Sequence, residues 1–353
     1  MKRIATGLAI MSMTTLAQGA VSVQGRFDYK RLETKTTTAA TATTTSTLKD
    51  SSGEYEVNLA RILTSGKIND SLTFDMELDL KQVSGATGGA VTDFVDSMVL
   101  TKKVGENFSV KLGKQDPLIG GFEWAQADSD VYAVSTFYTD GAPNSVGLSA
   151  HYTMLGHTLS LAHLETATNS GTSNSTTDKK VTGALLAGSY MDGMISTRFS
   201  HHQVGAAAGR TDLTGLGLQF VKDMFVVQLD YSMATKKNQG TNDAAATVDA
   251  KLNTMVAHVR YNHENYKPFV KYIMDKSEGS YALTNDVAGA ESERTVIEAG
   301  LEYSPNKDED MRYHLVYSMA ETKQKTGTTG TTARGKIEND TIVAGVKFGF
   351  NLL

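Results

Sequence analysis

The sequence contains no cysteine, and this absence excludes disulfide bonds and metal sites built on thiolates. It also lacks a long apolar run, since segments such as MFVVQL and GALLAG extend over only a few residues. A transmembrane helix needs roughly 18 to 20 apolar residues, so any crossing of a membrane must use another structure. Basic residues are not in excess either, with 34 Lys and Arg against 39 Asp and Glu, which argues against nucleic acid as a partner.

The first residues have the composition of a secretory signal peptide. Lys2 and Arg3 form a basic start, a weakly apolar core follows, and the letters AQG at 17–19 fit the small-x-small rule for cleavage. We therefore expect residues 1–19 to be a signal peptide and residues 20–353 to form one mature domain. Loss of the two basic residues leaves 32 Lys and Arg against 39 acids, a formal net charge of −7. The alternative is an ordinary N-terminal helix, which the strand pattern directly afterwards disfavours.

Polar and apolar residues alternate along segments of about ten residues in the rest of the chain. The segment SLTFDMELDLK, residues 71–81, alternates without a break and carries Asp75, Glu77 and Asp79 on its polar side. Successive side chains of a β-strand point to opposite faces, so the pattern predicts a strand with one apolar and one acidic face. Similar segments recur as far as the C-terminus, and their length matches that of a transmembrane β-strand.

The connections between these segments are of two kinds, which alternate along the chain. Short connections such as IND, LGH, MDG and KD contain residues that tight hairpins favour. Several long connections are low-complexity stretches, such as TTTAATATTTST at 36–47, for which we expect mobile, water-facing tips. Counting the segments gives about sixteen strands. Short turns at one end and long loops at the other predict an all-β fold, a transmembrane antiparallel up-and-down β-barrel with both termini at the periplasmic, short-turn end.

The mature chain resembles the general diffusion porins of Gram-negative outer membranes. The resemblance rests on the signal peptide, the amphipathic strands, the alternating loop lengths, the missing cysteine and the third long loop, QDPLIGGFEWAQADSD at 115–130. It implies a homotrimer in the lipids of the cell outer membrane, with a water-filled channel in each barrel. It also implies that the third loop folds into the barrel and narrows the channel. We expect no catalytic residue, no cofactor and no metal site.

The third loop is acidic. No Lys or Arg occurs between Gln115 and Asp178, and the candidate constriction residues are Asp116, Glu123, Asp128 and Asp130. Carboxylates without counter-charges in a narrow lumen concentrate cations and repel anions. We therefore expect weak cation selectivity, reinforced by the acidic wall at Asp75, Glu77 and Asp79. The alternative is a solvated external loop whose acids only keep it soluble.

The strand pattern also turns several basic side chains toward the lumen. With the apolar residues of each strand facing lipid, the inward positions include Arg26, Lys111, Arg260, Lys267 and Lys271. A charge on the lipid face at mid-bilayer depth costs roughly 2–4 kcal/mol, which favours the inward assignment. For each of these residues, a snorkelling or rim position is the alternative.

These observations predict a porin for passive diffusion of small hydrophilic solutes and ions. One alternative is a substrate-specific channel, for example for phosphate, which needs a ladder of Arg or Lys that the third loop lacks. Others are a structural or adhesive barrel that acts through its external loops, and a soluble secreted β-protein. A barrel hydrolase based on His201, His202 and Asp212 is disfavoured, because adjacent histidines on a strand point to opposite faces.

Overall fold

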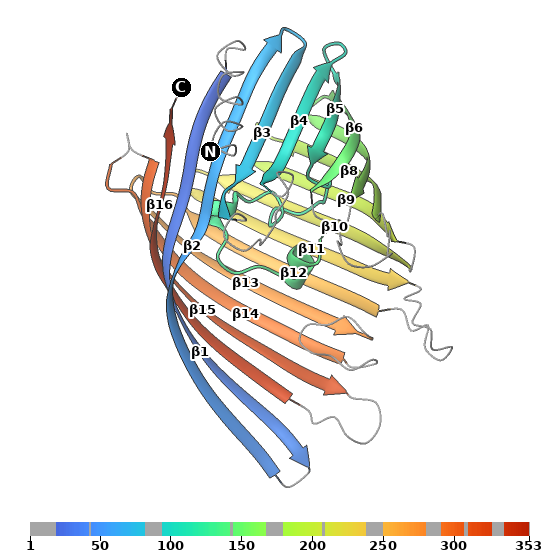
Figure 1. The fold of residues 1–353 in the computed structure, drawn as a ribbon. Coiled ribbons are helices and arrows are strands. Elements are labelled where there is room, and N and C mark those ends of the chain that lie inside the picture. The colour runs from blue at the N-terminus through green and yellow to red at the C-terminus, as the bar shows by residue number, and fades with distance from the viewer. Residues whose placement is uncertain are drawn as a thin grey trace, which may run out of the picture.

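A computed structural model of the protein describes residues 19–41, 44–81, 94–141, 144–166, 179–206, 209–237, 250–279, 291–306, 310–326 and 335–352. Apart from Gly19, the predicted signal peptide lies outside these residues. Within them, sixteen antiparallel strands form one closed barrel (Figure 1). Each strand pairs with its neighbours in sequence, and β1 pairs with β16. The fold is therefore the predicted up-and-down β-barrel.

The strands take up most of the described chain. They are β1 (Gly19–Thr41), β2 (Thr44–Asn69), β3 (Leu72–Asp79), β4 (Val95–Lys103), β5 (Phe108–Gln115), β6 (Ser145–Met154), β7 (His157–Thr166), β8 (Lys179–Tyr190), β9 (Ile195–Ala206), β10 (Gly209–Lys222), β11 (Phe225–Lys237), β12 (Ala250–Tyr261), β13 (Tyr266–Glu278), β14 (Glu291–Tyr303), β15 (Asp310–Thr326) and β16 (Gly335–Asn351). Two short helical turns, η3 (Asp128–Asp130) and α2 (Thr136–Thr139), lie between β5 and β6. No helix in the described part of the chain is long and apolar enough to cross a membrane.

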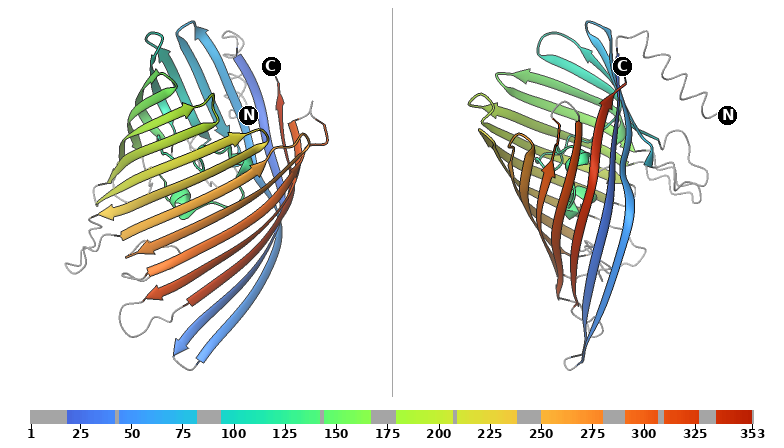
Figure 2. Two further views of the ribbon diagram at one scale, coloured as in Figure 1. Left: turned by 180° about the vertical axis from the view of Figure 1, so that it is seen from behind. Right: turned by 90° about the vertical axis from the view of Figure 1, so that its left-hand side faces the viewer.

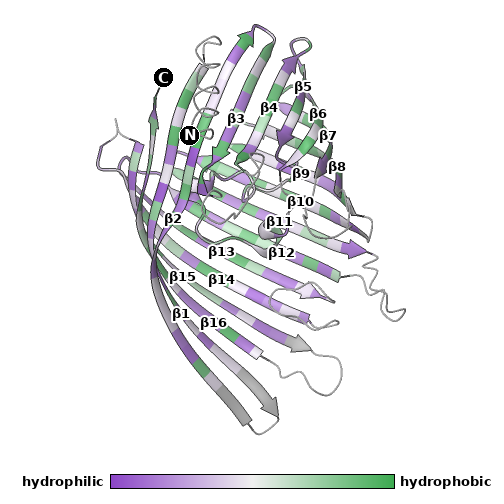
Figure 3. Cartoon of the chain, viewed as in Figure 1, coloured by the Kyte–Doolittle hydropathy of each residue, from purple (hydrophilic) through white to green (hydrophobic). Residues whose placement is uncertain are grey.

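The alternation of the sequence separates two faces of the barrel wall. On β15, His314 and Val316 are buried on the inner face, while the residues between and beside them are exposed on the outer face: Tyr313, Leu315, Tyr317 and Met319. Hydrophobic and hydrophilic bands alternate in the same way along other strands (Figure 3). An apolar surface that covers the outside of a closed barrel is the surface that a transmembrane barrel presents to lipid.

Aromatic pairs lie toward both ends of this apolar surface. The rings of Tyr29 and Tyr55 have their centroids 5.1 Å apart on β1 and β2. Nearer the opposite end of the strands, Tyr266 stacks on Tyr303 at 4.9 Å. Tyrosine has an apolar ring and a polar hydroxyl, which suits the boundary between lipid tails and water. The two pairs are therefore placed as the aromatic girdles of a membrane barrel.

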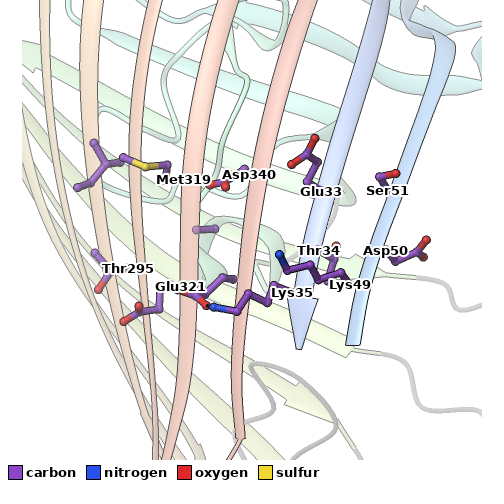
Figure 4. A pocket seen from close by; sticks show the side chains of 13 residues that line it. Glu33, Thr34, Lys35, Lys49, Asp50, Ser51, Thr295, Met319, Glu321 and Asp340 are labelled. Atoms are coloured by element: carbon purple, nitrogen blue, oxygen red, sulfur yellow. Dashed lines mark hydrogen bonds and ion pairs between the residues drawn. The ribbon is translucent and has the colours of Figure 1, made fainter. Parts of the chain in front are cut away.

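Beyond one of these girdles the outer face becomes charged. Lys35 pairs with Glu338 at 2.8 Å, and Lys336 pairs with Glu321 at 2.6 Å. Lys35 and Glu321 also line a cavity of about 810 Å³, together with residues of β2, β14 and β16 (Figure 4). Charged side chains are costly in the hydrocarbon region, so this cluster marks where the wall leaves it.

The first long connection differs from the prediction. The Thr-rich stretch 36–47 continues the strands instead of forming a mobile tip, because β1 extends to Thr41 and β2 begins at Thr44. Thr36 pairs with Leu48 and Thr37 with Thr47. Threonine is β-branched and packs well in extended chain, so a Thr-rich segment readily prolongs an existing hairpin. The hairpin of β1 and β2 reaches past the other strands (Figure 2).

The opposite end of the barrel has the predicted tight turns. Asp192 between β8 and β9 has φ of 56°, and Asp223 between β10 and β11 has φ of 53°. These are left-handed conformations, which Asp tolerates better than most residues. The described ends of the chain lie at this same end, since Leu352 donates a backbone hydrogen bond of 2.7 Å to the carbonyl of Val21.

Candidate functional site

The third loop, described over residues 116–141, lies inside the ring of strands (Figures 1 and 2). Ile119 and Phe137 of this loop are buried in a small hydrophobic cluster with side chains of β10, β11 and β12. Trp124, the sole tryptophan of the chain, packs against the same cluster. The loop is thus folded against one side of the inner wall.

The start of the loop is held by hydrogen bonds to β9 and β11. The backbone amide of Gly120 donates to the Ser200 hydroxyl at 2.6 Å. The amides of Phe122 and Glu123 donate to the two carboxylate oxygens of Asp230, at 2.8 and 2.7 Å. Hydrogen bonds to an ionised acceptor are stronger than neutral ones, so Asp230 is a firm anchor.

Glycines allow the loop backbone to lie directly on β10. A Cβ atom added to Gly215 would lie 2.8 Å from the carbonyl oxygen of Gly120. A Cβ atom added to Gly217 would lie 2.9 Å from the Cα atom of Gly121. Both distances are shorter than real Cβ contacts, so glycine is required on the wall where the loop backbone passes.

The end of the loop is held by β12, β13 and β14. Asp275 accepts hydrogen bonds from the Thr136 amide at 3.0 Å and from the Thr136 hydroxyl at 2.8 Å. Arg294 forms a salt bridge with Asp275 at 3.0 Å and donates to the carbonyl of Val134 at 3.0 Å. Thr136 begins helix α2, so this anchor fixes where the helical turn sits.

A buried ion pair also holds this part of the loop. Lys271 lies 2.8 Å from Glu123 and donates to the carbonyl of Ala133 at 2.8 Å. The amide of Ser135 donates to Glu123 at 3.1 Å and its hydroxyl at 2.5 Å. The side chains of Lys271 and Glu123 are only 3% and 7% exposed, so neither charge is available to ions in the channel.

The middle of the loop is held by β1, β15 and β16. Asp130 lies 2.6 Å from Lys347 and 3.1 Å from Arg312. Arg26 donates to the carbonyl of Val131 at 2.6 Å. Burial alone would raise the pKa of the Asp130 carboxyl, but the charges of Lys347 and Arg312 outweigh it and lower that pKa to about 2. Asp130 therefore stays ionised and attached to the wall over the physiological range.

Toward β2 and β3 the loop is joined by Arg61. The guanidinium of Arg61 lies 2.5 Å from the Asp128 carboxylate of the loop. The same guanidinium lies 2.5 Å from Glu77 on β3. The hydroxyl of Tyr138 donates to Asp128 at 3.2 Å, which orients the carboxylate from the loop side.

Two open cavities lie beside the loop. One, of about 640 Å³, is lined by the loop and by β1 to β4, and its charged lining residues are Arg61, Glu77, Asp96, Asp116 and Asp128. The other, of about 470 Å³, is lined by the loop and by strands on both sides of the β1–β16 pairing. The two cavities thus lie along β1 to β4 and β14 to β16, whereas Ile119 and Phe137 of the loop pack on β10, β11 and β12.

The structure separates the four acids predicted for the constriction. Asp116 and Asp128 line the larger cavity, while Glu123, Asp128 and Asp130 are each paired with a cation of the wall. Burial and the neighbouring carboxylates of Asp96 and Asp128 raise the pKa of Asp116. The sequence indicated a loop without counter-charges, because none lies within it. The counter-charges come instead from strands that are distant in sequence.

The predicted wall residues also differ in position. Of the acids, Glu77 lines the larger cavity, Asp75 is exposed, and Asp79 accepts a hydrogen bond of 2.9 Å from the Lys81 amide. Of the basic residues, three face the loop: Arg26, Lys271 and Arg260, the last 4.0 Å from Asp130. The two others, Lys111 and Lys267, are partly exposed.

Several residues that hold the loop were not singled out from the sequence. They are Arg61, Ser200, Asp230, Asp275, Arg294, Arg312 and Lys347. The alternation of polar and apolar residues that predicts an inward Arg260 also predicts that the side chains at these positions face the lumen. Their contacts with the loop were not visible, because periodicity within one strand says nothing about what lies across the lumen.

No hydrolytic or metal site is formed by the histidines that adjoin on β9. His201 is exposed, whereas His202 is fully buried, so the two point to opposite faces as predicted. The described residues contain no group of His, Asp or Glu side chains placed to hold a metal ion.

Comparison with known proteins identifies the family. Residues 37–267, well over half of the chain, match the family described as phosphate-selective porin O and P. No curated protein matches the sequence.

Solved structures of outer-membrane proteins share the fold. OmpT of Vibrio cholerae has a TM-score of 0.63 at 12% identity, with 94% of this chain and 97% of that chain covered. The anion-selective porin from Comamonas acidovorans has a TM-score of 0.58 at 14% identity, with 94% and 99% covered. The channel DcaP of Acinetobacter baumannii also scores 0.58, at 12% identity, with 94% and 98% covered. The predicted resemblance to porins is thus confirmed, although the matching family is not that of the general diffusion porins.

Porins of this family are channels and not enzymes, in agreement with the sequence. With its closed barrel, apolar outer face and inward third loop, the chain belongs to the family of phosphate-selective porins O and P, and it is an outer-membrane porin channel.

Proposed function

We propose that this porin lets small hydrophilic solutes and ions diffuse passively, with a weak preference for cations. The observation that carries the proposal is the lining of the larger cavity beside the third loop. Its described charged residues are four carboxylates and one guanidinium, that of Arg61. An excess of negative charge along a narrow water-filled passage raises the local concentration of cations.

The reversal potential of the channel in a planar lipid bilayer tests this preference. With a gradient of KCl across the bilayer, a cation-preferring channel makes the dilute side positive. We expect a small potential of this sign, because Arg61 offsets part of the acidic lining. A potential of the opposite sign would refute the cation preference.

A preference for anions such as phosphate is the second candidate. The phosphate selectivity for which the family is named favours it, as does the likeness to the anion-selective porin of Comamonas acidovorans. Basic side chains are also numerous in the barrel, but those near the loop are engaged: Lys347 binds Asp130, Lys271 binds Glu123, and Arg294 binds Asp275. Saturable phosphate flux, together with block of the chloride current by phosphate, would establish this candidate.

We further propose a homotrimer in outer-membrane lipids, with both termini in the periplasm. OmpT of Vibrio cholerae, which shares the fold, has a trimer form, and the chain ends of the present barrel lie with the tight turns. Periplasmic turns of bacterial barrels are short and external loops are long. Mass measurement in detergent tests the trimer, and protease protection of a C-terminal tag in intact cells tests the orientation. Purified barrels that conduct no ions would favour the structural or adhesive alternative.

A further inference from the structure

The two cavities beside the third loop meet at two side chains of that loop. Asp128 and Tyr138 are the described residues that line both of them. Asp128 is also the loop residue that binds Arg61, which lines the larger cavity from β2. The Arg61–Asp128 pair therefore extends from the wall to the loop at the boundary between two water-filled spaces.

Each side of this pair is supported by a second contact. On the wall, Glu77 holds the Arg61 guanidinium at 2.5 Å. On the loop, the Tyr138 hydroxyl holds the Asp128 carboxylate at 3.2 Å. The side chain of Arg61 is 16% exposed and that of Asp128 is 40% exposed, so the pair is reached by water. Because each side chain has a second contact, the pair has a defined geometry. Because both side chains are partly exposed, solutes in the cavities come into contact with it.

We propose that the Arg61–Asp128 ion pair is a bar across the channel that sets its size limit. This inference rests on the proposed diffusion function, but it concerns the size of solutes and not their charge. Loss of either side chain joins the two cavities of about 640 and 470 Å³ into one wider passage. The remaining anchors of the loop, on Asp230, Asp275 and Lys347, are unaffected by such a change.

Two substitutions separate size from charge. Arg61→Ala removes a positive charge from the passage, whereas Asp128→Ala removes a negative one. We expect the reversal potentials of the two variants to shift in opposite directions. We also expect both to admit larger uncharged sugars than the parent protein, measured by the swelling of proteoliposomes in a series of saccharides of increasing size. The two variants change the charge of the passage in opposite directions, so an increase in the size limit that both of them share has no electrostatic explanation.

Glu77→Gln is the matched control. Like Asp128→Ala it removes one negative charge from the larger cavity, but the oxygen of the glutamine side chain still accepts a hydrogen bond from Arg61, so the support of the Arg61–Asp128 pair is kept. We expect it to change the reversal potential and to keep the size limit of the parent. Correct folding of each variant is checked by its heat-dependent migration on a denaturing gel. The proposal that the pair sets the size limit would be refuted if either folded alanine variant kept the sugar limit of the parent. It would also be refuted if Glu77→Gln raised that limit as much as the alanine variants do. A reversal potential of the parent protein that shows anion preference would refute the proposed cation preference. The sugar limit does not depend on that result.

Discussion

Lys271 shows how much a single buried charge contributes to the position of the third loop. Replacement of Lys271 by Met leaves the Glu123 carboxylate buried without its cation. Breaking one partner of a buried ion pair costs roughly 3–5 kcal/mol, so we expect Lys271→Met to unfold at a clearly lower denaturant concentration. The measurement is the midpoint of unfolding in detergent, followed by tyrosine and tryptophan fluorescence.

The double variant Lys271→Met, Glu123→Gln is the control for this pair. It removes both charges and leaves a neutral side chain whose oxygen still accepts from the Ser135 amide and whose NH2 group donates to the Ser135 hydroxyl oxygen. Part of the lost stability should return, because two neutral groups in contact cost less than one unpaired charge. A double variant as unstable as the sum of the two single variants would show that the pair itself contributes nothing.

The pKa values of the two loop acids Asp116 and Asp130 are shifted in opposite directions: that of Asp116 is raised and that of Asp130 is lowered. Asp116 has a raised pKa because of burial and of Asp96, so it takes up its proton first as the pH falls. We expect the cation preference to weaken as the pH falls and this carboxylate is neutralised. The check is the reversal potential as a function of pH. Asp116→Asn should give a flatter curve, and a variant with the parent's full pH dependence would contradict the assignment.

Asp130 behaves differently in acid. Its pKa is lowered to about 2 in the folded protein, against an ordinary value of 3.8. A carboxylate with a lowered pKa stabilises the fold fully above its ordinary value, and this stabilisation is lost as the pH falls toward the lowered one. The contact with Lys347 therefore persists to a lower pH than the one at which Asp116 takes up its proton.

At the scale of elements, the contact between the third loop and β10 depends on glycine. A methyl group at Gly215 would lie 2.8 Å from the Gly120 carbonyl oxygen, so Gly215→Ala must displace the loop backbone. We expect a loss of about 1–3 kcal/mol, as for other overpacked contacts. We also expect faster cleavage of the loop by chymotrypsin, which is followed by mass spectrometry.

Gly205→Ala is the matched control for this substitution. Gly205 lies on β9 beside β10, and a Cβ atom there would meet nothing closer than the Lys180 carbonyl oxygen at 3.9 Å. The same chemical change should leave both stability and cleavage at the parent level. Equal behaviour of the two alanine variants would show that the loop does not rest on β10 in solution.

The strands could be predicted from the sequence, and the partners of the loop could not. The alternation of residues 71–81 predicts β3 and an inward Glu77, because a period of two is a property of the segment itself. The contact between Asp130 and Lys347 joins residues 217 positions apart. It exists only once the barrel has closed and the loop has folded inward. The acidic composition of the loop was therefore visible, while the pairing of Glu123, Asp128 and Asp130 with wall cations was not.

At the scale of the whole molecule, closure of the sheet makes the barrel resistant to detergent. Every described strand pairs with two neighbours, although the part of β2 before Arg61 pairs with β1 alone. We expect an unheated sample in dodecyl sulfate to migrate differently from a boiled one on a gel. A chain that ends before Gly335 lacks β16 and leaves β1 and β15 with one neighbour each. That truncated chain should show a single band under both conditions, and a heat-dependent shift would contradict the closure.

The pairing of β1 with β16 gives the barrel a seam between the two ends of the chain. It runs from Ser22 opposite Asn351 to Thr38 opposite Gly335. Because β1 and β16 are the first and last strands of the barrel, β1 lacks its second partner until the rest of the sheet has formed. Until β16 pairs with β1, the sheet has two open edges, which are templates for aggregation. The cell must therefore keep this chain from pairing with other copies of itself until β16 has paired with β1.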